Sequence, residues 1–274
     1  MKSSVFIVAI FCASSAFGAQ ARNDSVVQPL GAAPQLLIPV AGSTPGANGT
    51  FFRSDIAIIN FAPRDQKVKL QWVPQSGGAG STSTITIPLT SGIRSADFVA
   101  QYLNQSGLGS ILVTGVQSDG VTSDLNAQLY VSMRVWTPQP GTSGTTSQSL
   151  PAIPTSAVNT QIAALFAVGG ADNPANYRVN VGIVNLDPAN AQTFQIALPT
   201  SLGPQQPPFQ VTIAPMSMQQ IGIGNGLPAT QEVLIQNVTP AATRSNTWIS
   251  YGSTVDNVTG DAWSELAVAG TTGQ

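Results

Sequence analysis

The sequence of 274 residues has no histidine, and its only cysteine is Cys12. Without histidine, the chain cannot form a Ser-His-Asp or Cys-His catalytic centre or a histidine metal site. Cys12 lies in an N-terminal stretch that is expected to be removed, so the mature protein would form neither a disulfide nor a thiolate metal site. These absences exclude the commonest forms of nucleophilic and metal-assisted catalysis.

Charged residues are scarce as well, at 8% of the chain. After loss of Lys2, nine basic and twelve acidic residues remain, so the mature protein has no positive surface for nucleic acid or anionic lipid. A Ser-Lys dyad would need Lys67 or Lys69, which are expected to face solvent. A two-carboxylate hydrolase is possible in principle, but Glu232 and Glu265 lie in no recognisable context. We predict a non-catalytic protein with no cofactor and no nucleic-acid partner.

The N-terminal residues follow the pattern of a secretory signal peptide. A short positive start precedes an apolar stretch over Val5–Ala13, which is too short to span a membrane, and no later segment reaches that length. The Ala19-x-Ala21 pattern predicts cleavage before Arg22, with cleavage after Gly18 as the alternative. We therefore predict that residues 1–21 are a signal peptide and that the protein is secreted. The mature protein would then lie in the periplasm, at the cell surface or outside the cell.

One stretch occurs twice: Phe52–Pro63 (FRSDIAIINFAP) returns as Tyr177–Pro188 (YRVNVGIVNLDP). Without a gap, both copies keep an aromatic residue followed by Arg, then Asp or Asn, apolar residues at alternate positions, and Asn-x-x-Pro. Alternation of this kind is typical of a β-strand, and the closing Asn-x-x-Pro is typical of a turn. The repeat predicts two copies of one fold.

The segments around the two copies also correspond. The strand Lys67–Val73 is expected to pair antiparallel with the first motif strand, and residues 96–103 are expected to form one short helix. Five predicted strands of the first copy each have a counterpart in the second copy. The corresponding residues are 36–40 and 162–168, 67–73 and 192–198, 84–89 and 209–213, 110–114 and 232–238, and 128–136 and 246–255. Short strands at this spacing predict an all-β fold with two tandem Ig-like antiparallel β-sandwich domains. Their predicted bounds are 36–154 and 155–274, after an N-terminal arm over 22–35.

Two further stretches resemble a known family. Ile38-Pro39-Val40 followed by Pro45–Asp55 and Asn60, together with Tyr251–Asp261 near the C-terminus, resembles the tandem β-sandwich repeat modules of secreted bacterial proteins. Such modules are often appended to extracellular proteases or surface proteins. The resemblance implies a non-catalytic extracellular module of Ig-like shape, and it assigns no binding residues.

The motif residues are candidates for a site. Arg53 and Asp55 share a strand face, so the guanidinium can pair with the carboxylate or with nearby loop carbonyls. The second copy has Arg178 and Asn180 at these positions, and an asparagine cannot act as a general base. A structural role is therefore the main interpretation, with a ligand contact by the arginines as the alternative.

Other polar residues are assigned to turns. Asn60 and Asn185 precede the x-x-Pro step and are expected to make Asx-type turn hydrogen bonds. Asp256 and Asp261 bracket a polar turn that could offer oxygen atoms to calcium, but the alternating ligand order of a calcium loop is missing. A plain turn is the favoured interpretation.

Tryptophan offers a last candidate, because exposed indole rings could stack on sugars, whereas rings on strands are more often packed in the core. The four tryptophans, all on or beside predicted strands, are Trp72, Trp136, Trp248 and Trp263.

Three functions are consistent with the sequence. The leading hypothesis is a surface or extracellular interaction module with an unidentified protein or glycan partner. The second is a carbohydrate-binding module that uses exposed Trp or Tyr. The third is a filament or surface-fibre subunit that self-associates when its 22–35 arm adds a strand to a neighbour's sheet.

Overall fold

The computed structural model describes residues 31–46, 49–78, 80–139, 143–158, 160–166, 168–170, 172–199 and 206–270. The predicted signal peptide and most of the predicted arm lie outside these residues. The chain is nearly all β, with 57% strand and 6% helix, which confirms the predicted all-β class. No helix among the described residues has the length and apolar character needed to cross a bilayer.

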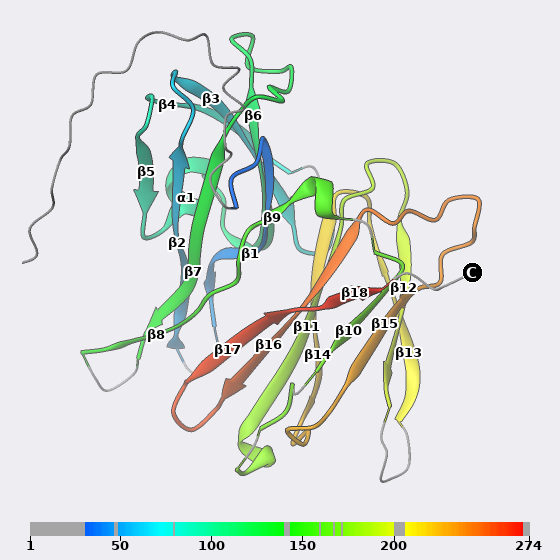
Figure 1. The fold of residues 1–274 in the computed structure, drawn as a ribbon. Coiled ribbons are helices and arrows are strands. Elements are labelled where there is room, and N and C mark those ends of the chain that lie inside the picture. Colours follow the sequence, from blue (N-terminus) through cyan, green and yellow to red (C-terminus); the bar gives the residue numbers. More distant parts are fainter. Residues whose placement is uncertain are drawn as a thin grey trace, which may run out of the picture.

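The first half, residues 35–154, forms two layers of antiparallel strands (Figure 1). One layer has the order β4-β3-β6-β1-β9 and the other the order β5-β2-β7-β8. Its elements are β1 (Gln35–Pro45), β2 (Phe51–Asn60), β3 (Gln66–Pro74), β4 (Thr82–Ile87), β5 (Gly92–Ser95), α1 (Phe98–Leu103), β6 (Gly107–Val116), β7 (Leu129–Pro138), β8 (Thr145–Gln148) and β9 (Ile153–Pro154). Strand β1 joins the layers, because most of its length pairs with β6 while Ser43–Pro45 pairs with β2. Its register with β6 shifts between Ile38 and Ala41, at an irregularity that contains Pro39.

The second half, residues 162–270, repeats this order of strands in two separate sheets, because β10 does not pair with β11 over the described residues. Its sheets have the orders β13-β12-β15-β10-β18 and β14-β11-β16-β17. Its strands are β10 (Ile162–Leu165), β11 (Tyr177–Asn185), β12 (Gln192–Leu198), β13 (Gln206–Ile213), β14 (Ser217–Asn225), β15 (Val233–Asn237), β16 (Trp248–Asp256), β17 (Ala262–Leu266) and β18 (Val268–Gly270). Two short 3-10 turns, η2 (Thr155–Ala157) and η3 (Pro174–Asn176), precede β10 and β11 respectively. The duplicated sequence is therefore accompanied by a duplicated order of strands.

The predicted partner of the first motif strand was wrong. Strand β3, which contains Lys67–Val73, pairs with β4 and β6, whereas the motif strand β2 pairs with β1, β5 and β7. The turn after Asn60 carries the chain from one layer to the other, so that Val68 and Leu70 enter the core from the opposite side. Alternation shows that one face of a strand is buried, but it does not show which layer the strand joins.

Strand β14 was missed by the sequence analysis. It pairs with β11 along the motif, in the place that the short β5 followed by α1 takes in the first half. The segment SMQQIGIGN carries two glycines and two glutamines, which weakens the strand signal. This exchange of a helix for a strand is the main difference between the two halves.

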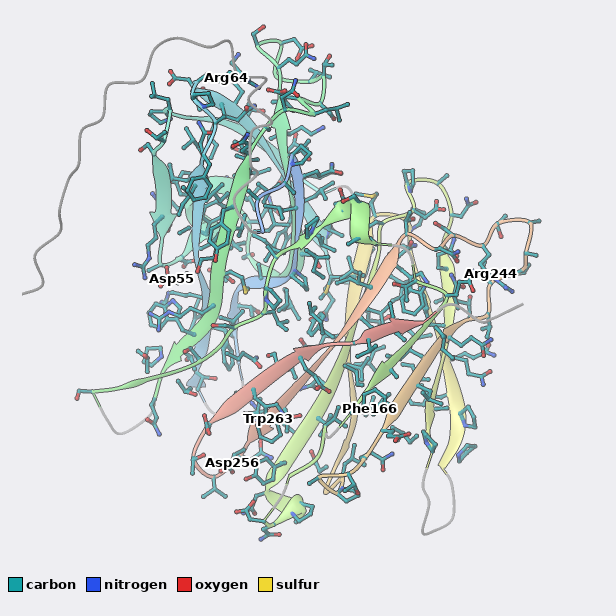
Figure 2. The ribbon with its side chains drawn as sticks, viewed as in Figure 1. Asp55, Arg64, Phe166, Arg244, Asp256 and Trp263 are labelled. Carbon is teal, nitrogen blue, oxygen red and sulfur yellow. The ribbon has the colours of Figure 1, made fainter. Side chains whose placement is uncertain are left out.

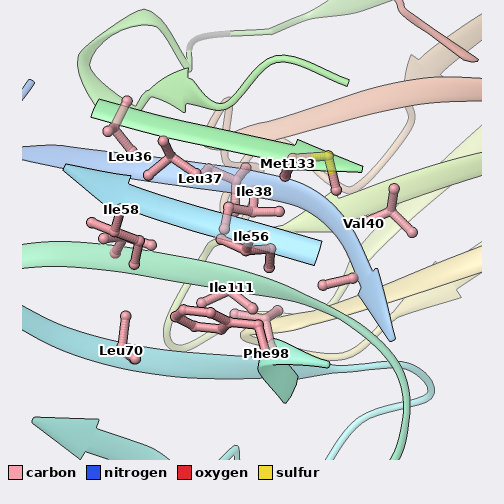
Figure 3. Packing of buried hydrophobic residues seen from close by; sticks show 14 of the residues in the cluster. Leu36, Leu37, Ile38, Val40, Ile56, Ile58, Leu70, Phe98, Ile111 and Met133 are labelled. Carbon is pink, nitrogen blue, oxygen red and sulfur yellow. The ribbon is translucent and has the colours of Figure 1, made fainter. Parts of the chain in front are cut away.

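Each half has a core between its layers. In the first half, β-branched and leucine side chains of β1, β2, β3 and β6 pack around Phe98 of α1 (Figure 3). In the second half, the rings of Phe194 and Trp248 pack with centroids 4.8 Å apart. Both interiors are apolar, as the alternating patterns predicted.

The sheet of β11 is buried on both faces. Val181, Ile183 and Trp248 face the second core, while Val184 and Tyr251 on the other face belong to the first half's cluster. Figure 1 shows this sheet lying between the first half and the strands β10, β12, β13 and β15. Residues on the outer face of β11 are therefore covered by the first half.

Candidate binding cleft

Polar contacts join the two halves at several points. Ser217 Oγ donates to the carbonyl oxygen of Pro74 at 2.9 Å, and the backbones of Gln75 and Met218 form an isolated β-bridge. At the other end of the junction, Thr146 Oγ1 donates to the carbonyl oxygen of Gly260 at 2.6 Å. The halves touch at these points and leave a space between them.

That space is a cleft of about 630 Å³. Strands β1, β2, β7 and β8 form the wall from the first half, and β11, β14, β16 and the turn before β17 form the opposite wall. Apolar side chains such as Phe52 and Val135 alternate in its lining with amides, hydroxyls and Arg178. Its volume falls in the range of about 300–1,000 Å³ that small-ligand sites occupy.

In the first copy of the motif, the acidic residue is held by two arginines. Asp55 is 3% exposed, and Arg94 donates hydrogen bonds to both of its carboxylate oxygens at 2.8 and 2.7 Å. Arg134, directly opposite on β7, donates to Asp55 Oδ2 at 3.1 Å. The hydrogen bonds from Arg94 are the largest cause of the lowered pKa of Asp55, against the opposing effect of burial.

The expected pairing of Arg53 with Asp55 is not made. Arg53 instead lies 3.5 Å from the carboxylate of Asp97, just before α1. Its guanidinium stacks over the rings of Phe51, at 4.6 Å, and Trp136, at 5.6 Å. The sequence did not indicate these partners, because Asp97, Arg94 and Arg134 are distant along the chain from the motif.

The second copy replaces this ionic group with neutral side chains. By strand register, Asn180 takes the place of Asp55, Gln220 that of Arg94, and Ser253 that of Arg134. All three neutral residues line the cleft, whereas Arg94 and Arg134 in the first half keep side-chain exposures of 70% and 41%. The ionic group is thus replaced at these three positions, where the first half covers the sheet, and burying ions is unfavourable.

The neutral residues are held in place by their neighbours. Ser253 Oγ donates to Gln148 Oε1 at 3.0 Å across the junction, and Ser264 Oγ donates to the same atom. Gln220 Oε1 accepts from Tyr251 Oη at 3.0 Å. The Tyr251 ring lies against Gly182, where a Cβ would come within 2.0 Å of it. Glycine at this motif position therefore allows Tyr251 to orient Gln220.

Arg178 is the cationic side chain among the described residues of the cleft. Its only hydrogen-bond partner among them is the amide oxygen of Asn257, and no carboxylate of the described chain lies within 4.0 Å of it. Burial lowers the pKa of Arg178. In the described second half, β14 takes the place of β5 and α1, so no described residue there corresponds to Asp97.

The two motif asparagines make the predicted turn bonds. Asn60 Oδ1 accepts from the backbone N–H of Ala62 at 2.9 Å, and Asn185 Oδ1 accepts from that of Asp187 at 3.0 Å. Both asparagines are 0% exposed. They stabilise the crossing between layers and lie away from the cleft.

The acidic turn shows no sign of a metal site. Asp256 accepts from Val258 N–H at 2.8 Å and from Thr259 Oγ1 at 2.6 Å, and Asp261 Oδ1 accepts from the N–H of Ala262. Within the described part of the chain, no three His, Cys, Asp or Glu side chains gather to hold a metal ion. Figure 2 places Asp256 at the end of the second half near Trp263.

The tryptophans do not form a common surface. Trp72 and Trp248 are 3% and 0% exposed, and Trp136 Nε1 donates to the carbonyl oxygen of Ala96 while its ring takes part in the Arg53 stack. Trp263 is 37% exposed and meets Tyr177 edge to face at 5.7 Å. A platform built from all four rings is therefore not present.

Residues that the sequence analysis did not select also form the cleft, notably Gln75, Gln148, Gln220 and Ser253. The only sequence signal for them is the change from Asp55 to Asn180 at matched motif positions. Comparison of the sequence with models of known protein families gave no match, and comparison with curated proteins gave none. The cleft is accordingly interpreted from its geometry and chemistry.

Glu265 on β17 gives a first testable prediction. Burial raises the pKa of this carboxyl, against the effect of the Phe166 backbone N–H, and its Oε1 is buried without a partner in the described structure. A raised folded-state pKa means that the stability it contributes is present at low pH and lost as pH rises. We expect Glu265→Gln to stabilise the protein at pH 7, by less than about 1 kcal/mol because the residue is only partly buried and solvent screens its charge.

The measurement is urea unfolding at pH 7 and at pH 4. The gain should shrink towards pH 4, where the wild-type carboxyl is protonated in the folded protein. Glu232→Gln, at an exposed position, is the matched control and should change little. An equal gain at both pH values would show that ionisation of Glu265 is not the cause.

Proposed function

We propose that this protein is a secreted, non-catalytic pair of tandem Ig-like β-sandwich units that serves as an extracellular interaction module, with the cleft between its halves as the binding surface. The repeated strand order supports the tandem arrangement. The observation that carries the binding role is the cleft of about 630 Å³, whose wall presents the neutral polar side chains of Asn180, Gln220 and Ser253.

The lining favours binding over catalysis. Asp256 is the one carboxylate among the described lining residues, and both of its oxygens accept hydrogen bonds within its own turn. General acid–base chemistry at a glycosidic bond needs two carboxyl groups that face each other. Amides and the hydroxyls of Ser and Thr, by contrast, donate and accept hydrogen bonds while remaining uncharged at neutral pH.

The experiment is a binding screen of the mature protein on arrays of glycans and peptides. Asn180→Trp would fill the cleft, and Ser132→Trp would place the same ring at an exposed position of β7 outside it. We expect wild type and Ser132→Trp to bind a common set of targets and Asn180→Trp to bind them at least tenfold more weakly. Circular dichroism would establish that both variants are folded. Unchanged binding by Asn180→Trp would rule out the cleft.

The two alternative functions gain less support. Carbohydrate binding through a tryptophan platform would rely on Trp263 and its neighbour Tyr177, since Trp72 and Trp248 are buried. Filament formation through the arm stays a prediction, because residues 22–30 lie outside the described part of the chain. Light scattering across a concentration series would test self-association directly.

A further inference from the structure

The two motif arginines have different surroundings. Arg53 has a carboxylate at 3.5 Å and two aromatic rings beneath it. Arg178, at the matched position, faces the cleft with one amide oxygen as its partner. A guanidinium offers five N–H donors in a planar fork that matches a carboxylate. Most of the donors of Arg178 are therefore available to a ligand.

The amides around Arg178 add further donors. Gln220 and Gln148 use their Oε1 atoms as acceptors for Tyr251, Ser253 and Ser264. Their Nε2 groups have no partner among the described residues. The Asn180 amide likewise makes no hydrogen bond within the described chain. The groups of Arg178, Gln148 and Gln220 that have no partner are therefore donors, which favours a ligand that is rich in oxygen and carries negative charge.

We propose that the cleft binds an acidic oligosaccharide, with a uronate carboxylate on Arg178 and sugar hydroxyls on Asn180, Gln148 and Gln220. This inference rests on the proposed function and names its ligand class. An acidic peptide is the less suitable occupant, because acidic motifs are usually recognised by clusters of arginines, and the described lining has one arginine among many neutral groups. The apolar faces of Phe52 and Val135 lie in the same cleft, where sugar C–H groups could pack.

The test is calorimetric titration with trimers of galacturonate, glucuronate, guluronate and mannuronate, each compared with its methyl ester. The esters keep the hydroxyls and remove the charge. We expect at least one acid trimer to bind, its ester to bind at least tenfold more weakly, and the affinity to fall with added salt. Absence of binding by all four acids, or equal binding of acid and ester, would overturn the inference.

Two variants connect binding to the arginine. Arg178→Gln and Asn180→Asp should each weaken acid binding at least tenfold, the first by removing the cation and the second by adding a carboxylate to the same strand face. Arg244→Gln is the control of equal charge change, and Figure 2 shows Arg244 far from Asp256 at the cleft. Unchanged binding by Arg178→Gln would contradict the inference, and so would binding of a hexaglutamate peptide in preference to all uronates. If Asn180→Trp weakens binding of the array targets but Arg178→Gln leaves it unchanged, the proposed function stands and this inference fails.

Discussion

Replacement of Asn60 by alanine is expected to lower the free energy of unfolding by about 3–5 kcal/mol. Asn60 Nδ2 donates to the carbonyl oxygens of Arg64 at 2.7 Å, Ile87 at 3.2 Å and Pro88 at 3.2 Å. Its Oδ1 accepts from the N–H of Ala62. Because the side chain is fully buried, alanine would leave these groups without partners and without water. Urea unfolding measures the loss.

The second copy supplies an internal repetition of this experiment. Asn185 Nδ2 donates to the carbonyl oxygens of Asn190 at 3.0 Å, Ile213 at 3.2 Å and Ala214 at 3.0 Å. Asn185→Ala should therefore cause a loss of the same size. The exposed Asn126→Ala is the control and should change stability by less than about 0.5 kcal/mol.

The Asn60→Asp variant separates the hydrogen bonds that the side chain donates from the one that it accepts. Asn60→Asp keeps an oxygen for the N–H of Ala62 but places a second oxygen against three carbonyl oxygens. We expect a loss at least as large as that of alanine at pH 7. If Asn60→Asp retained wild-type stability, the donated hydrogen bonds would be unimportant and the explanation would be wrong.

These asparagines also show what could be predicted from the sequence. The motif strands, their turn and the buried faces follow from alternation and from Asn-x-x-Pro, which are local patterns. The Asx bond spans two residues, from Asn60 to Ala62. The bonds from Asn60 to Ile87 and Pro88 span 27 and 28 residues. No local pattern indicates those carbonyl groups.

The cleft could not be predicted for a related reason. Its walls depend on how the second half's sheet packs against the first half, which brings Gln148 to Ser253 across 105 residues. Strand β11 contains alternating polar and apolar positions, yet both of its faces are buried. The sequence shows that Asn180 stands where the first copy has Asp55. Only the structure shows that this face of β11 is covered by the first half, which explains the change.

The ionic group of the first half leads to the second large effect. Arg94→Gln combined with Arg134→Ser should lower stability by about 2–4 kcal/mol at pH 7, because the buried Asp55 carboxylate would lose both cations. Addition of Asp55→Asn to this pair would reproduce the second copy's Asn180, Gln220 and Ser253. We expect the triple variant to recover to within about 1 kcal/mol of wild type, so that a third substitution stabilises the protein. A triple variant no more stable than the double variant would contradict this account.

The pH dependence distinguishes ionic pairing from simple loss of packing. In the wild type, the lowered pKa of Asp55, caused chiefly by Arg94, means that its contribution to stability is present above the ordinary carboxyl pKa and is lost as pH falls through the folded-state value.

In the double variant, burial without cations should raise the pKa of Asp55, so its destabilising effect is greatest at neutral pH and is relieved as pH falls. Relative to the triple variant, which has no ionisable group here, the wild type should therefore lose stability as pH falls below about 4, whereas the double variant should gain stability as pH falls from neutral towards about 4. Unfolding curves with the same slope against pH for all three proteins would mean that the charge on Asp55 does not stabilise the first half. The neutral residues of the cleft would then need an explanation other than their burial.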